Sequence, residues 1–275
     1  MSSSDAISPT AHYTGQVWSR NGLSHPMLST REGWVLYEAL HPIMSASGAL
    51  GGPSLETYLL ARHRAIDALL ERAIEEHGIT QVVEVAAGFS PRGWRFVTRY
   101  GDRITYVEAD LPEMAARKRE ALKRIGTLSD QHRVEDLDAL RESGRGSLAA
   151  LAADLDPERG LVIITEGLLG YLPSEAVEGL WRRFASTLSG FSSGRYISDL
   201  HLGSKVNVAV RGFRLVLAAF VRGRVYLHFD GAEDAEAGLL RSGFAHAAVR
   251  PAWQVVDTGD DRGSQLAHIL EASTE

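Results

Sequence analysis

The chain has 275 residues, of which 44% are hydrophobic and 23% charged, an ordinary balance for a globular protein. Its formal charge of −6 argues against binding to a phosphate backbone, so no nucleic-acid partner is predicted. The absence of cysteine excludes disulfides, thiolate zinc sites and a cysteine nucleophile, and no other metal site is predicted. No apolar run reaches membrane-spanning length and the first ten residues lack an apolar signal core, so we expect a cytoplasmic protein without a membrane partner.

The change of amino-acid composition along the chain predicts one domain preceded by a short tail. Residues 1–11 are predicted to be a flexible tail, and the stretch 45–54 is predicted to be a loop because it is rich in Gly and Ser. Within the single domain, 12–275, we expect in chain order a helical cap at 12–78, a cofactor-binding core at 79–200, a cap insertion at 201–230, and a C-terminal helix and strand pair at 231–275. Whether the chain forms a homo-oligomer is left open by the sequence.

From Gln81 onward, apolar runs alternate with helical patterns, which is typical of a parallel sheet with right-handed crossovers. The strands are predicted at 81–86, 103–108, 132–136, 161–165, 194–200, 245–250 and 265–271. The helices are predicted at 55–77, 91–100, 112–125, 146–155, 173–188 and 232–241, and the apolar and basic segment 205–223 is also predicted to be helical. This order predicts an α/β fold with a seven-stranded sheet whose last strand is antiparallel.

The stretch 80–96, TQVVEVAAGFSPRGWRF, reads as a buried strand, a turn of small residues and a helix. Such a turn allows a ligand to approach the backbone closely. Only Gly88 occupies a glycine position of the G-x-G-x-x-G pattern that a dinucleotide pyrophosphate requires, and Ala86 fills another. S-adenosylmethionine carries no phosphate and has cationic groups that an acid such as Glu84 could meet. An ordinary buried strand without a ligand would give the same pattern.

Acidic residues follow the next two strands as well. Glu108 and Asp110 end the second strand, where a carboxylate can accept both hydroxyls of a ribose, and we favour Glu108 for that role. The same spacing serves nicotinamide cofactors. Asp136, after the third strand, could accept a hydrogen bond from an adenine amino group while Leu137 packs on the ring.

The fourth strand, LVIITEGLLGYL, is continuously apolar until it reaches Glu166. Ligands of open α/β sheets lie outside the carboxyl ends of the strands, at the point where the strand order reverses. That point falls between the first and fourth strands, so Glu166 is predicted to face the ligand above Gly88. A buried structural glutamate is the alternative.

The chain resembles the leucine carboxyl methyltransferase family of class I S-adenosylmethionine-dependent methyltransferases, which have a Rossmann-like fold. The resemblance rests on four motifs in order: VVEVAAGFSPRGWRF, YVEADLPEMAARK, VEDL and ITEGLLGYLP. The opening SPTAHYTGQVWSRNGLSHP is similar to the branch that contains the tetracenomycin polyketide carboxyl methyltransferase.

The resemblance implies S-adenosylmethionine as the cofactor and assigns roles to single residues. Gly88 and Ala86 would lie under the methionine part, and Arg62 would pair with its carboxylate. The remaining implied contacts are the ribose to Glu108, the adenine to Asp136 and Leu137, and the amino-acid end to Glu166.

The predicted reaction is methylation of an oxygen of a small molecule, with the carboxylate of an aromatic or polyketide-like acid favoured. A carboxylate is ionised at neutral pH and needs no general base, whereas a phenol or alcohol needs one. The substrate-side candidates are His201, Tyr171, Tyr13 and Arg20, together with His12, Trp18, Arg211 and Arg214. The alternatives are hydroxyl methylation, methylation of a protein C-terminus, a non-catalytic cofactor-binding protein, and an NAD-dependent oxidoreductase.

Overall fold

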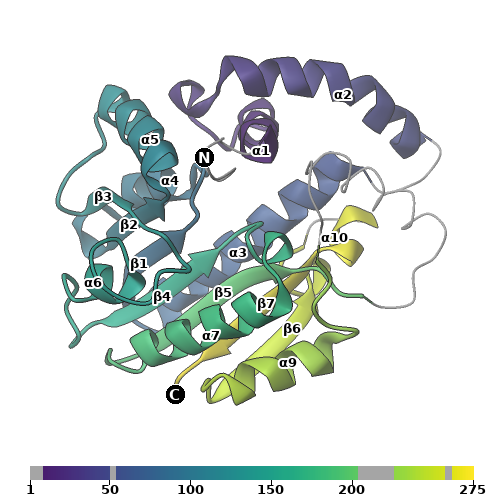
Figure 1. Ribbon diagram of the computed structural model, residues 1–275. Helices are drawn as coiled ribbons and strands as arrows, with labels where there is room; N and C mark the ends of the chain where they lie inside the picture. Colours follow the sequence, from purple (N-terminus) through teal and green to yellow (C-terminus); the bar gives the residue numbers. More distant parts are fainter. Residues whose placement is uncertain (1–8, 50–53, 204–225, 258–261) are drawn as a thin grey trace.

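The computed structural model describes residues 9–49, 54–203, 226–257 and 262–275, and its centre is a seven-stranded sheet (Figure 1). The strand order is β3-β2-β1-β4-β5-β7-β6, and β7 is antiparallel to both of its neighbours. The strands are β1 (Ile79–Val85), β2 (Thr105–Asp110), β3 (His132–Asp136), β4 (Gly160–Thr165), β5 (Gly194–Leu200), β6 (His246–Pro251) and β7 (His268–Ser273). The predicted α/β architecture with an antiparallel last strand is therefore confirmed.

Helices cover both faces of the sheet, which makes three layers. One face packs against α3 (Leu55–Glu76), α4 (Arg92–Tyr100), α5 (Pro112–Ile125) and α10 (Arg262–Leu266). The other face packs against α6 (Leu148–Ala152), α7 (Ser174–Leu188) and α9 (Ala232–Arg241). In Figure 1, α7 and α9 lie in front of the sheet and α3 lies behind it.

The continuous apolar runs form the strands because the sheet is covered on both sides. Val82 and Val162 belong to the core under α3, whereas Val83 and Ile163 belong to the core under α7, and all four are fully buried. Neighbouring residues of one strand thus enter different cores. The order of strands reverses between β1 and β4, as expected, and open α/β sheets commonly bind ligands above such a point.

Two helices stand over the carboxyl edge of the sheet, α1 (Pro9–Arg20) and α2 (Arg31–Ala49), and they pack against each other (Figure 1). Residues 9–11 are helical, although the sequence predicted a tail over 1–11. Residues 45–49 are also helical, although they were predicted to be a loop. α3, which falls within the predicted cap of 12–78, packs on a face of the sheet.

Some predicted boundaries shift. β2 runs two residues further than predicted, so Glu108 lies inside the strand and Asp110 ends it. β7 begins at His268, and Gln265 belongs to the short α10 instead. The predicted insertion helix at 205–223, with Arg211 and Arg214, lies outside the described residues.

Candidate functional site

The turn after β1 forms the base of the candidate site. Ala86 and Gly88 both have left-handed backbone conformations, with φ of 55° and 50°. The Gly88 N–H donates to Asp110 Oδ2 at 2.7 Å, which joins the turn to the end of β2. A Cβ atom at Gly88 would lie 3.7 Å from the Cβ of Ala11 in α1, so the cap approaches this turn closely. Gly88 therefore serves both the left-handed turn and the contact with α1.

Glu166 and Arg62 form the opposite wall. Glu166 follows β4, and Arg62 reaches it from α3, with Nε donating to Glu166 Oε1 at 3.0 Å. Arg62 Nη1 also donates to Asp199 Oδ2 at 3.2 Å, and Asp199 Oδ1 accepts the Gly167 N–H at 2.6 Å. These bonds fix a guanidinium and a carboxylate side by side at the reversal point of the sheet.

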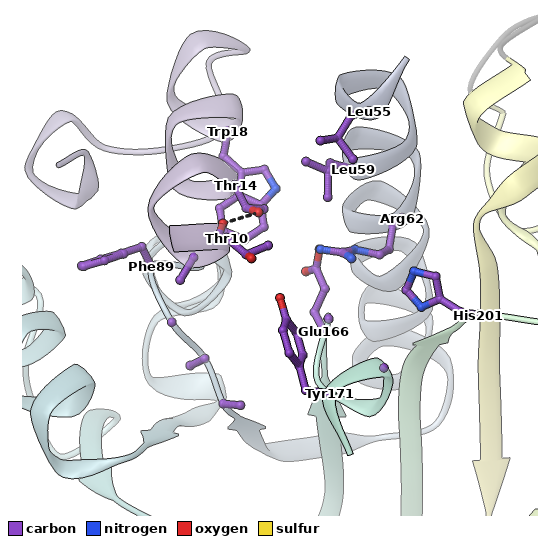
Figure 2. A pocket seen from close by; sticks show the side chains of 16 residues that line it. Thr10, Thr14, Trp18, Leu55, Leu59, Arg62, Phe89, Glu166, Tyr171 and His201 are labelled. Atoms are coloured by element: carbon purple, nitrogen blue, oxygen red, sulfur yellow. Dashed lines mark hydrogen bonds and ion pairs between the residues drawn. The ribbon is translucent and has the colours of Figure 1, made fainter. Parts of the chain in front are cut away.

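A pocket lies between the turn, this wall and the cap, and it encloses about 740 Å3 of space including its open mouth (Figure 2). It is bounded by α1, α3, the turn after β1 and the segments after β4 and β5. The lining residues are Thr10, Ala11, Thr14, Trp18, Leu55, Leu59, Arg62, Ala86, Ala87, Gly88, Phe89, Glu166, Gly167, Gly170, Tyr171 and His201.

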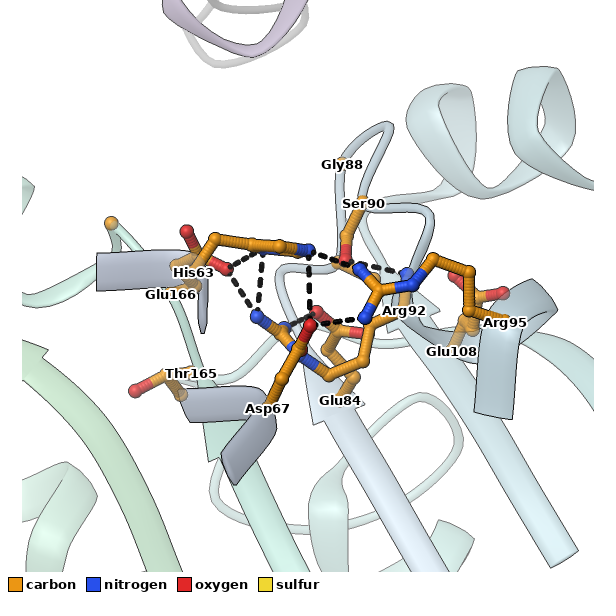
Figure 3. Close-up of polar contacts among 12 residues, drawn as sticks. His63, Asp67, Glu84, Gly88, Ser90, Arg92, Arg95, Glu108, Thr165 and Glu166 are labelled. Atoms are coloured by element: carbon orange, nitrogen blue, oxygen red, sulfur yellow. Dashed lines mark hydrogen bonds and ion pairs between the residues drawn. The ribbon is translucent and has the colours of Figure 1, made fainter. Parts of the chain in front are cut away.

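A buried network of ion pairs supports this wall from below (Figure 3). Its centre is Arg92, the first residue of α4, whose side chain is fully buried. Arg92 Nε donates to Asp67 at 2.6 Å, Nη1 to Glu84 at 2.5 Å and Nη2 to Glu166 at 2.6 Å. One guanidinium thus binds carboxylates from α3, β1 and the segment after β4.

His63 and Arg95 extend this network toward α3 and α4. His63 Nδ1 lies 2.9 Å from Glu166 Oε2, and the ring of Trp18 packs on the imidazole with centroids 4.7 Å apart. Arg95 pairs with Asp67 and contacts His63 Nε2 at 3.1 Å. The network therefore also contacts the cap, through Trp18.

The network sets the ionisation of the wall. Burial alone would raise the pKa of Glu166, but His63, Arg92 and Arg62 outweigh it and hold that pKa well below its usual range. Burial is likewise outweighed at Asp67, whose pKa is lowered by His63, Arg92 and Arg95. The carboxylates raise the pKa of Arg92 well above its ordinary value. Glu166 is therefore ionised at neutral pH.

Glu108 does not lie in the pocket, which corrects its predicted ribose role. Its carboxylate is fully buried below α4, where it forms an ion pair with Lys118. His132 Nε2 lies 2.7 Å from Glu108 Oε1, within hydrogen-bond distance. A Cβ atom at Gly93 would overlap with Glu108 Oε1, so the first turn of α4 covers this acid. Lys118 Nζ donates to Ser90 O at 2.6 Å. The Glu108 cluster (Glu108, Lys118 and His132) thus supports the turn from behind.

Asp110, two residues further along β2, takes the exposed end of the strand. Its Oδ1 accepts the Leu111 N–H at 2.8 Å, and its Oδ2 accepts from Gly88. Burial raises the pKa of Asp110, although both backbone bonds act in the opposite direction. The acid nearest the turn is therefore Asp110.

Asp110 and six further predicted residues, His12 among them, also lie outside the pocket lining. Glu84 is buried and binds Arg92 and the Tyr106 hydroxyl, because its strand position points it under α4. Leu137 is a core residue, and Asp136 pairs with Arg119 at the surface. Tyr13 is buried within the cap and stacks on Tyr37, and Arg20 pairs with Glu38 on its outside.

Seven predicted residues do meet in the pocket: Trp18, Arg62, Ala86, Gly88, Glu166, Tyr171 and His201. His201 Nε2 lies 3.0 Å from the Tyr58 hydroxyl, and burial raises the pKa of Tyr58 above its usual value. Tyr171 is partly exposed at the rim. The pocket thus joins a charged wall to two side chains that can exchange hydrogen bonds with a ligand.

Several site residues were missed by sequence reasoning. Arg92, Asp67 and Asp199 were not singled out, although all three are buried. Asp199 had a signal, because it is an acid near the end of an apolar strand. Arg92 had none, since an arginine in a first helical turn is ordinarily solvated.

The chain is similar to known methyltransferases in sequence. The sequence profile of the leucine carboxyl methyltransferase family matches residues 22–185. A provisionally named S-adenosyl-L-methionine-dependent methyltransferase of Frankia alni is 36% identical over 125 residues, which are 46% of this chain and 42% of that protein. The chain thus matches less than half the length of this curated relative.

Two solved structures share the fold over almost the whole chain. A DUF574 family protein from Streptomyces avermitilis has a TM-score of 0.66 at 13% identity and covers 97% of both chains. A protein of Thermobifida fusca, provisionally described as a methyltransferase, has a TM-score of 0.65 at 14% identity and covers 98% of this chain and 96% of its own.

The fold is that of the class I methyltransferases, and the profile match spans more than half of the sequence. The chain belongs to the leucine carboxyl methyltransferase family. None of the helices within the described residues combines the length and the hydropathy that crossing a membrane requires. Those residues also contain no group of three or more His, Asp or Glu side chains arranged to hold a metal ion.

Proposed function

We propose that the protein is an S-adenosylmethionine-dependent methyltransferase acting on an oxygen of a small molecule, with the carboxylate of an aromatic or polyketide-like acid as the preferred acceptor. The observation that carries this proposal is the Arg62–Glu166 pair, which faces the left-handed turn at Ala86 and Gly88 across one pocket. Family membership supports the reaction type, and the opening SPTAHYTGQVWSRNGLSHP supports the polyketide-like class of acceptor.

The residues present fit this cofactor. An amino-acid group carries one carboxylate and one ammonium, and Arg62 and Glu166 offer one partner for each. The turn carries no side chain larger than a methyl group at Ala86, Ala87 and Gly88, so a ligand can lie against its backbone. Asp110 is the acid best placed for a ribose, because it ends β2 beside Gly88.

The chain's own residues would orient the reactants and exclude water. When bound, the cofactor supplies an electrophilic methyl group on a sulfonium, and displacement of that methyl leaves a neutral thioether. Glu166 stays ionised and holds the cationic end in place, while Trp18, Leu55 and Leu59 close the pocket on the cap side. A carboxylate acceptor gives up no proton, so no base is required.

Methylation of a phenol is the second candidate, because His201 lines the pocket and could take a proton. His201→Ala should leave the rate with an aromatic acid within about twofold, since that reaction needs no base. The same variant should lower the rate with a phenol by about 10²-fold or more. Mild alkali releases methanol from an ester but not from an aryl ether, so the two products are distinguished directly.

Calorimetric titration tests the cofactor. S-adenosylmethionine and S-adenosylhomocysteine should bind with micromolar dissociation constants, and NAD should not bind. Arg62→Gln should weaken both ligands at least tenfold through loss of a charged hydrogen bond. Arg64→Gln, at an exposed position of the same helix, is the matched control. Binding of NAD in place of the two sulfur ligands would contradict the proposal.

A further inference from the structure

One hydrogen-bond donor in the pocket wall lacks a partner among the described residues. The indole Nε1 of Trp18 is buried, the residue is only 5% exposed, and no described acceptor reaches that nitrogen. Leaving a buried N–H group without an acceptor costs about 1–3 kcal/mol. Trp181 Nε1 shares this condition inside the core, but Trp18 also lines the pocket, where a ligand atom can serve as its acceptor.

The surroundings fix where this donor points. Trp18 comes from α1, and its ring packs on His63, which holds the indole plane in place. Figure 2 shows the Trp18 ring between α1 and α3, with its nitrogen turned toward Leu55 and Leu59. Both leucines line the same pocket. The donor thus faces an apolar crevice at the cap end of the pocket.

The charges in the pocket lie at its other end. Among the described residues that line it, Arg62 is the only arginine or lysine, and it already pairs with Glu166 and Asp199. A ligand oxygen under the cap therefore meets a neutral donor and leucine side chains. A close ion pair would stabilise the anionic oxygen and make it a weaker nucleophile. A neutral donor binds that oxygen without forming such a pair, so the oxygen stays nucleophilic.

We propose that Trp18 determines acceptor specificity, and that its indole N–H binds one carboxylate oxygen of a planar aromatic acid whose ring lies against Leu55 and Leu59. The second oxygen of that carboxylate is then free to receive the methyl group. This inference rests on the proposed methyltransferase function and assigns its acceptor site.

The test uses 2-naphthoate as the probe, titrated into protein saturated with S-adenosylhomocysteine. Trp18→Phe keeps an aromatic ring on His63 and removes the N–H donor together with part of the fused ring. It should weaken 2-naphthoate at least tenfold, as expected for a bond to a charged acceptor, and change the S-adenosylhomocysteine constant less than twofold. Trp34→Phe, at a 52% exposed position on α2, is the matched control and should change neither constant. The cation 2-naphthylmethylammonium, with the same ring system, should not bind.

Three results would overturn the assignment. They are equal affinity of Trp18→Phe and wild type for 2-naphthoate, no binding of 2-naphthoate to the wild-type complex, and a parallel loss of S-adenosylhomocysteine binding. Failure of S-adenosylhomocysteine to bind wild type would instead contradict the proposed function itself, so the two failures are distinguishable.

A second measurement covers the case in which Trp18→Phe does not fold. Wild-type protein labelled with ¹⁵N-tryptophan has five indole N–H groups. On addition of 2-naphthoate one indole proton resonance should move downfield, and it should be one that persists in the Trp34→Phe, Trp94→Phe and Trp253→Phe variants. Unchanged indole resonances under saturating 2-naphthoate would contradict the proposal.

Discussion

Two buried acid–base clusters lie on the same face of the sheet, and they differ in what they border. The Arg92 network joins Asp67, Glu84 and Glu166, and one of its acids lines the pocket. The Glu108 cluster also pairs an acid with basic groups, but all of its side chains are enclosed. The comparison teaches that depth along a strand, more than residue type, separates an acid that lines the pocket from one that is fully enclosed.

The largest effect is expected when the centre of the first cluster is removed. Arg92→Met leaves three buried carboxylates without their shared partner, so the free energy of unfolding should fall by about 3–5 kcal/mol in urea titrations. The control is Arg99→Met, since Arg99 is about half exposed where it pairs with Glu71, and it should change stability by no more than about 1 kcal/mol. Equal losses in the two variants would show that burial of the network contributes little.

Glu108→Gln tests the second cluster and the revised role of this acid. Loss of the charge leaves the buried Lys118 ammonium with neutral partners only, which should cost about 2–3 kcal/mol of unfolding free energy. Glu113→Gln, at an exposed pair with Arg117 on α5, should be nearly neutral. Cofactor affinity per folded molecule should stay within about threefold. Unchanged stability together with strongly weakened cofactor binding would support the original prediction that Glu108 binds the ribose.

The smallest effect is the dependence of stability on pH. The acids of the two clusters have lowered pKa values in the folded state, whereas Asp110 has a raised one, so they change stability in opposite directions as pH falls. The pKa values of Glu166, Asp67 and Glu108 are lowered in the folded state, so these groups stabilise the fold above their ordinary pKa values and lose that contribution as pH falls. The pKa of Asp110 is raised, so its protonation favours the fold at low pH. The unfolding free energy should therefore decrease from pH 6 to pH 3.

Two variants separate these contributions. Each titrating group changes the slope of unfolding free energy against pH by at most about 1.4 kcal/mol per pH unit. Asp110→Asn removes the opposing group, so its stability should decrease more steeply with acid than that of wild type. Glu108→Gln should make the decrease shallower. Urea unfolding at pH 6, 5, 4 and 3 in the absence of ligand measures both slopes, and identical slopes in all three proteins would contradict the assigned signs.

Most of the sheet could be predicted from the sequence because its strands are continuously apolar and its turns are short. The depth of Glu108 could not. Residues two apart in a strand share a face, so the alternation of side chains places Glu108 and Asp110 identically. The two acids differ in their burial because β1 and β3 pair with β2 and because α4 packs over Glu108. These neighbours come from other parts of the chain.

The site was predictable where a residue followed a strand directly, as with Gly88 and Glu166. It was not predictable where the function of a side chain depends on packing between helices. Tyr13 and Trp18 belong to one helix and both face inward, yet Tyr13 packs against α2 and only Trp18 lines the pocket. The sequence contains no signal for the angle at which α1 crosses α3.

The position of α3 also bears on how the chain reaches its fold. This early helix packs against β5, β7 and α10, so its apolar face is covered by strands and a helix from the far end of the sequence. Long-range closure of this kind slows folding, because an extended loop must be ordered before the contacts form. Chains that end before His268, and so lack β7, should therefore expose part of the α3 face and aggregate, even when every residue that lines the pocket is present.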